Sequence, residues 1–133
     1  MWKKKYCTAC PYVKTGSEVK IDRETTWKIN KKLTCDTFNC VYLIECEKCG
    51  NKYIGEKGRI IRNRLSEHRG YVNNQLVSVS TGEHFNLPGH SLANMKITII
   101  EQIKKNDIMY RKERETYFIN KFNSYYQGLN REK

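Results

Sequence analysis

The pattern of hydrophobic and polar positions marks four short strand-like runs in the first part of the chain, and the first two of them alternate. The first two, residues 19–21 and 27–29, flank a polar turn and predict a short amphipathic hairpin. The next two, residues 41–45 and 52–55, are separated by a Gly-Asn pair that favours a tight turn. We therefore expect the second two runs to pair as an antiparallel hairpin.

The pattern changes to helical spacing after this second hairpin. Ile61 and Leu65 lie one helical turn apart among charged residues, which predicts an amphipathic helix over residues 59–69. Residues 70–95 carry Gly, Asn, Ser and Pro at short intervals and show no clean period. They are expected to form a loop with a short ordered insert.

A strand and a helix complete the pattern. Residues 96–101 predict a third strand, and Asp107 is suited to cap a helix that continues to about Phe122. Ile108 and Ile119 are expected to face inward from this helix, together with Phe122. The resulting layout is ββαβα, an α+β fold in which a small antiparallel β-sheet is flanked by helices.

A chain of 133 residues fits one domain with a modest core. No repeat or Pro-rich linker divides it, and the weakest join lies near residues 31–34. We therefore predict an N-terminal cysteine-containing extension over residues 1–34 and a main domain over residues 35–133. No apolar run could cross a bilayer, and the amino end lacks the apolar stretch of a secretory signal. We expect an intracellular protein with no membrane partner.

Basic residues outnumber acidic ones by 25 to 14, which gives a formal net charge of +11. This excess favours a polyanionic partner, with nucleic acid as the first candidate. A ribosomal protein or a membrane-surface binder would carry a similar charge, so charge alone does not decide the function.

Six cysteines offer additional stability to a chain whose hydrophobic content is only 38%. In a reducing compartment they stay free or bind metal. Two of the cysteine pairs have the C-x2-C spacing of tetrahedral zinc sites. The sequence therefore favours zinc over disulfides.

Two tyrosines and two helix residues are candidates for chemistry. Tyr42 and Tyr53 lie on the two strands of the second hairpin, so their phenols converge if they share a face; ordinary cross-strand packing is the alternative. Arg64 and His68 are four positions apart and lie on the same side of the predicted helix. Arg64 is either a solvated charge paired with Glu67 or a planar ligand for phosphate oxygens.

Glu115 lies near the apolar stripe of the last helix, together with Ile119. A carboxylate directed towards a buried side needs a cation. Arg111, one turn earlier, supplies that cation in a purely structural interpretation. A divalent metal ion supplies it in a catalytic interpretation.

The order of these residues resembles that of the GIY-YIG nuclease family. The first motif reads Cys40-Val41-Tyr42, with cysteine in place of the family's glycine, and the second reads Tyr53-Ile54-Gly55. The resemblance covers roughly residues 40–130. It implies a metal-dependent DNA endonuclease with the GIY-YIG fold. The family's polar site residues correspond to Tyr42, Tyr53, Arg64, His68, Glu115 and Asn130.

The resemblance also implies a role for each of these residues. Tyr42 would be the general base, Arg64 would stabilise the phosphoryl group, and Glu115 would hold one Mg²⁺ or Mn²⁺ ion near the leaving oxygen. Assistance with orientation and maintenance of the architecture would fall to Tyr53, His68 and Asn130. A phenol with an ordinary pKa near ~10 is a poor base at neutral pH, so Tyr42 needs neighbouring positive charge.

Within the family, the sequence is most similar to the endonuclease domain of Penelope-like retroelements, over the runs 41–50, 53–56 and 84–90. That subtype carries an insert of cysteines and histidines, which here gives a four-coordinate zinc site of Cys46, Cys49, His84 and His90. A second zinc site is predicted from Cys7, Cys10, Cys35 and Cys40. Alternatively, Cys40 packs within its strand and leaves three cysteines that need another ligand.

The same resemblance implies partners and a location. DNA would be the substrate, a reverse transcriptase domain would belong to the same natural polypeptide, and the nick would prime copying of the element's RNA. We accordingly expect a nuclear location. Two other interpretations are a catalytically silent zinc-ribbon module that binds nucleic acid, and a regulatory domain that kept the nuclease fold without its activity.

Overall fold

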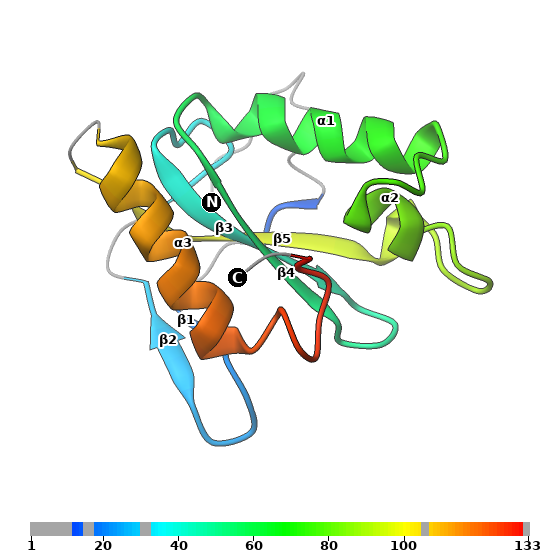
Figure 1. Ribbon diagram of the computed structural model, residues 1–133, viewed down its shortest axis with the longest axis horizontal. Coiled ribbons are helices and arrows are strands. Elements are labelled where there is room, and N and C mark those ends of the chain that lie inside the picture. The colour runs from blue at the N-terminus through cyan, green and yellow to red at the C-terminus, as the bar shows by residue number, and fades with distance from the viewer. Residues whose placement is uncertain (1–11, 15–17, 30–32, 105–106, 132–133) are drawn as a thin grey trace.

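The computed structural model describes residues 12–14, 18–29, 33–104 and 107–131 (Figure 1). Its centre is a three-stranded antiparallel sheet in the order β4-β3-β5. The strands are β3 (Cys40–Cys46), β4 (Lys52–Lys57) and β5 (Met95–Gln102). The predicted hairpin and the predicted third strand are both confirmed, and β3 is paired on both of its edges.

Helices cover both faces of this sheet (Figure 1). α1 (Ile61–Asn73) and the short α2 (Ser80–His84) lie on one face, and α3 (Ile108–Phe122) lies on the other. A short 3₁₀ helix, η2 (Leu92–Asn94), precedes β5. The ββαβα layout and the α+β fold class are therefore confirmed. None of the helices in the described parts of the chain is long and apolar enough to cross a membrane.

The two long helices differ in detail from the predictions. α1 continues past the predicted end because Gly70 remains helical and Val72 packs into the core on the next turn. α3 begins at its predicted cap, since the Asp107 carboxylate accepts a hydrogen bond from a backbone amide of the first turn. The prediction that Ile108 faces inward is wrong, because its side chain is 58% exposed. The buried side of α3 instead starts at Arg111.

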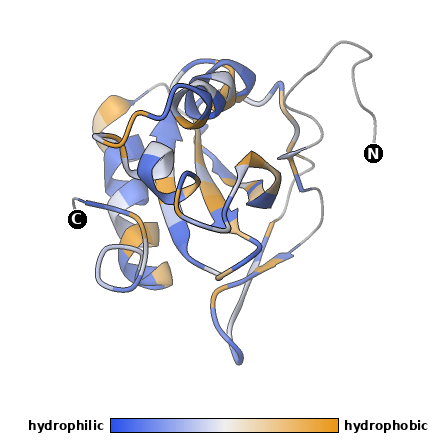
Figure 2. Ribbon diagram, turned by 90° about the vertical axis from the view of Figure 1, so that its right-hand side faces the viewer, coloured by the Kyte–Doolittle hydropathy of each residue, from blue (hydrophilic) through white to orange (hydrophobic). Residues whose placement is uncertain are grey.

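Successive β3 side chains alternate between two hydrophobic cores. Tyr42 and Ile44 belong to the core beneath α1, and Val41 and Leu43 belong to the core beneath α3. Hydrophobic segments of the sheet lie at the centre of the molecule in Figure 2. Tyr42 is therefore directed towards α1 and away from α3.

The N-terminal hairpin packs onto the α3 side of the main domain. It consists of β1 (Glu18–Lys20) and β2 (Thr26–Lys28), paired antiparallel as predicted. Trp27 contacts the Phe118 ring edge-on, with centroids 4.9 Å apart, and donates its indole N–H to the Ile100 carbonyl at 3.2 Å. The hairpin thus adds to the core of the main domain, and a domain boundary at residue 34 stays a prediction.

Candidate active site and metal cluster

Tyr42 lies at the centre of a buried polar cluster beneath α1. Its side chain is completely buried, and its hydroxyl oxygen lies 2.9 Å from Nε2 of His68. Arg64, one turn earlier on α1, donates from Nε to the same oxygen at 3.2 Å. The structure therefore brings together three of the residues that the sequence singled out.

Gly55 provides the space that the Tyr42 ring occupies. The two residues are partners across β3 and β4. A Cβ atom at residue 55 would lie 2.4 Å from the Tyr42 hydroxyl oxygen, which is too close for any side chain. The Tyr42 ring thus lies across the backbone of β4, a close approach that glycine permits. The sequence identified Gly55 only as part of the second motif and did not predict this packing role.

The hydrogen bonds determine which nitrogen of His68 carries its proton. The Tyr42 hydroxyl accepts from Arg64, which cannot accept in return, so its own proton finds an acceptor in this cluster when it donates to an unprotonated Nε2 of His68. The protonated Nδ1 then donates to Oγ1 of Thr81 on α2, 2.8 Å away. Burial, with the charge of Arg64, lowers the pKa of His68 to about 3, so the imidazole is neutral. Thr81 was not among the predicted site residues.

The phenol of Tyr42 is also neutral. Burial raises its pKa above the ordinary value, and the neighbouring charge of Arg64 only partly opposes this effect. The positive charge that a general base requires is therefore present next to Tyr42, but the effect of burial on the pKa outweighs it. Tyr42 also has no exposed surface from which to contact a water molecule.

Tyr53 connects the buried cluster to an open hollow. Its ring centroid lies 6.5 Å from that of Tyr42 and 5.5 Å from that of His68. The two tyrosines therefore share a face of the sheet. Tyr53 is half-buried and lines a hollow of about 330 Å³. The other residues that line this hollow are Ser78, Val79, Ser80, Glu115, Ile119, Asn130 and Arg131.

Opposite charges act on the Tyr53 phenol. Burial raises the pKa of Tyr53, the charge of Arg64 lowers it, and the charge of Glu115 raises it further. A guanidinium from α1 and a carboxylate from α3 are therefore both within electrostatic range of this one hydroxyl group. Side chains from three separate elements meet around Tyr53.

Arg111, the structural candidate for the cation beside Glu115, has other partners. Its Nε atom forms an ion pair with Glu56, and its Nη1 atom donates to Oδ1 of Asn39 at 2.8 Å. Arg64 forms the predicted ion pair with Glu67 at 2.9 Å and also donates to Tyr42, whereas its role as a ligand for phosphate oxygens stays a prediction.

Asn130 binds the backbone of β4 from the C-terminal segment. Its Oδ1 atom accepts the Ile54 amide at 2.7 Å, and its Nδ2 atom donates to the Ile54 carbonyl at 2.9 Å. The hydroxyl of Ser124 donates to the same Oδ1 atom at 2.6 Å. The side chain thus completes the edge of β4 within the second motif.

Asn130→Ala is expected to destabilise the fold by about 1–3 kcal/mol, because two polar backbone groups of β4 lose their partners. The measurement is the midpoint of urea unfolding. Asn120→Ala, which removes an exposed amide from α3, is the matched control and should shift the midpoint little. Equal effects from both substitutions would contradict this role of Asn130.

A second cluster, formed by Cys46, Cys49, His84 and His90, lies at the far end of the sheet. One ligand atom from each residue lies within 4.8 Å of all the others. The Cys49 sulfur is 3.4 Å from Nε2 of His84. Nε2 of His90 is buried without a hydrogen-bond partner among the described residues, whereas its Nδ1 lies 3.2 Å from the Pro88 carbonyl. A tetrahedral donor set with an unsatisfied imidazole nitrogen fits a zinc ion.

The second zinc site that the sequence predicted is only partly within the described residues. Cys7 and Cys10 lie outside them, whereas Cys35 and Cys40 are both buried. Burial raises the pKa of the Cys40 thiol to about 12, and the side chain packs beside Tyr42 in the core. This position in the core agrees with the alternative that Cys40 packs within its strand. The second zinc site stays a prediction.

Comparison with protein families decides which family this arrangement belongs to. The model of the GIY-YIG catalytic domain matches residues 38–130, from just before β3 to Asn130. The chain is a GIY-YIG protein. GIY-YIG domains are nucleases, which makes nuclease activity and a DNA substrate the family-level function. No curated protein and no solved structure matches the chain.

GIY-YIG nucleases are metal-dependent, so the hollow next to Tyr53 must suit a cation as well as a substrate. Glu115 supplies a carboxylate oxygen there, which is the ligand type that Mg²⁺ and Mn²⁺ prefer. The hollow is open to solvent, so water can complete the coordination of a hard cation. The residues present therefore fit a divalent metal ion.

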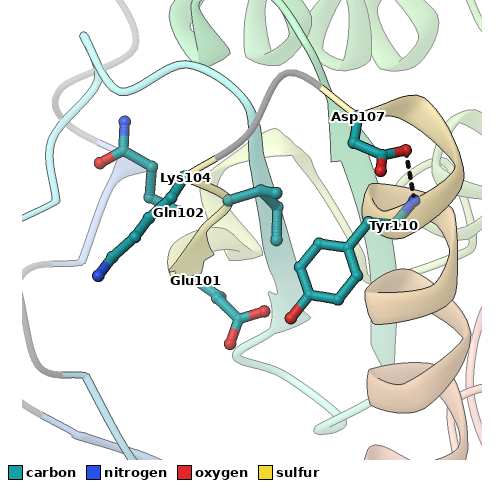
Figure 3. Close-up of a pocket in the computed structure, with 6 residues that line it drawn as sticks. Glu101, Gln102, Lys104, Asp107 and Tyr110 are labelled. Carbon is teal, nitrogen blue, oxygen red and sulfur yellow. Dashed lines mark hydrogen bonds between the residues drawn. The ribbon is translucent and has the colours of Figure 1, made fainter.

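Another hollow of the GIY-YIG domain, of about 490 Å³, lies between the end of β5 and the start of α3 (Figure 3). Its two carboxylates already have partners within the fold. Asp107 caps α3, and Glu101 forms a two-point ion pair with Arg114, at 2.6 and 2.9 Å. Both carboxylates that line this hollow are therefore engaged in capping and ion pairing within the fold.

Proposed function

We propose that this GIY-YIG domain is a metal-dependent DNA endonuclease that hydrolyses a phosphodiester bond in the hollow between Tyr53 and Glu115. The observation that carries the proposal is the position of Tyr53, within electrostatic range of both Arg64 and Glu115. Hydrolysis of a phosphodiester needs an activated water, a cation for the phosphoryl oxygens and help for the leaving oxygen. In this proposal Tyr53 activates the water, Arg64 neutralises the phosphoryl oxygens and Glu115 holds the metal ion that assists the leaving oxygen.

Tyr53, and not Tyr42, is the tyrosine that contacts the attacking water in this proposal. A general base must lie within hydrogen-bonding reach of the proton that it accepts. Tyr53 lines the hollow, whereas Tyr42 is completely buried. The role of general base that the family resemblance implied for Tyr42 is therefore assigned to Tyr53. Tyr42 holds the guanidinium of Arg64 and the imidazole of His68 in position.

Arg64 and Glu115 serve the two sides of the phosphate. The guanidinium neutralises charge that develops on the phosphoryl oxygens, and its orientation is fixed by Tyr42 and by Tyr71, whose hydroxyl lies 3.1 Å from Nη1. Glu115 holds Mg²⁺ or Mn²⁺. When bound, the cation stabilises negative charge on the leaving oxygen. Asn130 keeps the β4 edge in place beneath these groups.

The wider biological setting in this proposal is that of a Penelope-like retroelement. The Cys46, Cys49, His84 and His90 cluster holds a structural Zn²⁺, as in the insert of that subtype. The nick then primes reverse transcription of the element's RNA by a polymerase domain of the same natural polypeptide, and the site of action is the nucleus. The support for this setting is the similarity over residues 41–50, 53–56 and 84–90.

The proposal is tested with supercoiled plasmid and Mg²⁺ or Mn²⁺. Wild-type protein should convert the plasmid to the nicked form only when the divalent ion is present. Arg64→Ala and Glu115→Ala should each lower the rate by about 10²–10³-fold, since each removes a group that stabilises transition-state charge. Glu113→Ala, an exposed carboxylate on the same helix, is the matched control and should nick normally.

Two results would contradict the proposal in different ways. Nicking that survives both Arg64→Ala and Glu115→Ala would overturn the site. Tight DNA binding without any metal-dependent nicking would favour the silent zinc-ribbon module, and the absence of both DNA binding and nicking would favour a regulatory domain.

A further inference from the structure

Arg64 helps to line a hollow of about 590 Å³ that is separate from the Tyr53 hollow and is strongly basic. Four cationic side chains line it: Lys57, Arg59, Arg64 and Arg111. The remaining lining residues are Glu56, Gly58 and Ile108. We call this the basic hollow. Arg64 acts electrostatically on Tyr53 and donates to Tyr42 behind it, so this side chain connects the basic hollow to the proposed catalytic centre.

Two of these four cations have no counter-ion among the described residues. Arg111 and Arg64 form ion pairs with Glu56 and Glu67. Lys57 and Arg59, by contrast, take part in none of the ion pairs within the part of the chain that the structure describes. Unpaired cations that line one concave surface raise the local concentration of anions. The basic hollow is therefore suited to an anionic ligand from outside the chain.

The basic hollow and the Tyr53 hollow lie one after the other along α3 and β4. Ile108 and Arg111 line the basic hollow, and Glu115 and Ile119 line the Tyr53 hollow. These four positions follow one another along one stripe of α3, at spacings of three and four residues. The start of β4 likewise contributes to the Tyr53 hollow, and the end of β4 to the basic hollow.

The combined length of the two hollows suits more than one phosphate of one strand. α3 is unbroken from Ile108 to Phe122, so the stripe from Ile108 to Ile119 is continuous. At 1.5 Å per residue, this stripe spans about 16 Å along the helix axis. One DNA strand carries a phosphate about every 3.4 Å of duplex axis and a longer distance along the strand itself, so this length accommodates more than one phosphate.

We propose that the basic hollow binds the DNA backbone on the side of the cut phosphate that lies away from Glu115. Lys57 and Arg59 are the phosphate ligands that are specific to this inference. The inference rests on the proposed function only for the position of the cut phosphate. In this inference the substrate strand continues from the Tyr53 hollow past Arg64 into the basic hollow.

The test is DNA binding by the full chain with Lys57→Ala and Arg59→Ala combined. Both substitutions are made in a Glu115→Gln background, so that the fluorescent duplex stays intact while its anisotropy is measured. The affinity should fall by about tenfold or more near 0.1 M salt, and the slope of log K against log salt should become less steep by about 2 units, because two phosphate contacts are lost. Lys57→Arg with Arg59→Lys should restore both values.

The matched control is Lys20→Ala combined with Lys28→Ala, which removes the same charge from exposed positions of the β1–β2 hairpin. An equal loss of affinity in this control would mean that only net charge matters, and would overturn the inference. Unchanged binding by the Lys57 and Arg59 variant would overturn it as well. Neither result depends on cleavage, so a failure of the nicking assay would be recognised separately.

Discussion

Tyr53→Phe is expected to lower the rate of plasmid nicking by about 10³-fold, within the range known for loss of a general base. The substitution removes only the hydroxyl group, and Tyr53 is half-buried at the edge of its hollow, so the fold should be retained. The measurement is the nicking rate at saturating DNA, together with the thermal unfolding midpoint. Tyr126→Phe, at an exposed position, is the control and should nick normally.

Tyr42→Phe separates the two tyrosines. It leaves Nε2 of His68 without its donor and Nε of Arg64 without its acceptor, so it should cost about 1–3 kcal/mol of stability as well as some activity. The loss of activity should be smaller than that of Tyr53→Phe. The opposite order, with Tyr42→Phe the less active variant at full stability, would return the role of general base to Tyr42.

Loss of the metal from the Cys46, Cys49, His84 and His90 cluster is expected to lower the thermal unfolding midpoint by at least about 10 °C, because ligand binding to this site is coupled to folding. Cys49→Ala should show this shift, and elemental analysis should show about one zinc ion fewer per chain than in the wild type. Glu115→Ala should change neither quantity. Wild-type protein without any zinc would contradict the assignment.

The elements of the fold were predictable because their signals are local. The short apolar runs of β3 and β5, the helical period of α1 and α3, and the cap at Asp107 all depend on residues close together in the chain. The cysteine and histidine cluster was also predicted, from the spacing of Cys46 and Cys49 and from the family resemblance that implied His84 and His90 as their partners. The strands, the helices and the cap could therefore each be predicted from their own segment of the sequence.

The features that the sequence did not reveal depend on contacts between distant elements. The burial of Tyr42 follows from α1 packing over β3, and the space for its ring comes from Gly55 on the neighbouring strand. Thr81 has no local signal, because it contacts His68 only after α2 folds back against α1. The helical period alone predicted that Ile108 faces inward, but its side chain is exposed at the first turn of α3.

The five residues of α2 join the two clusters, because the helix carries both Thr81 and His84. A movement that releases His84 from the cysteines would also withdraw the hydroxyl that orients His68. The imidazole could then rotate, and Tyr42 would lose its proton acceptor. Oxidation of the Cys46 and Cys49 thiols to a disulfide would remove two donor atoms from the cluster that α2 joins through His84, and α2 would transmit this change to Thr81 and His68.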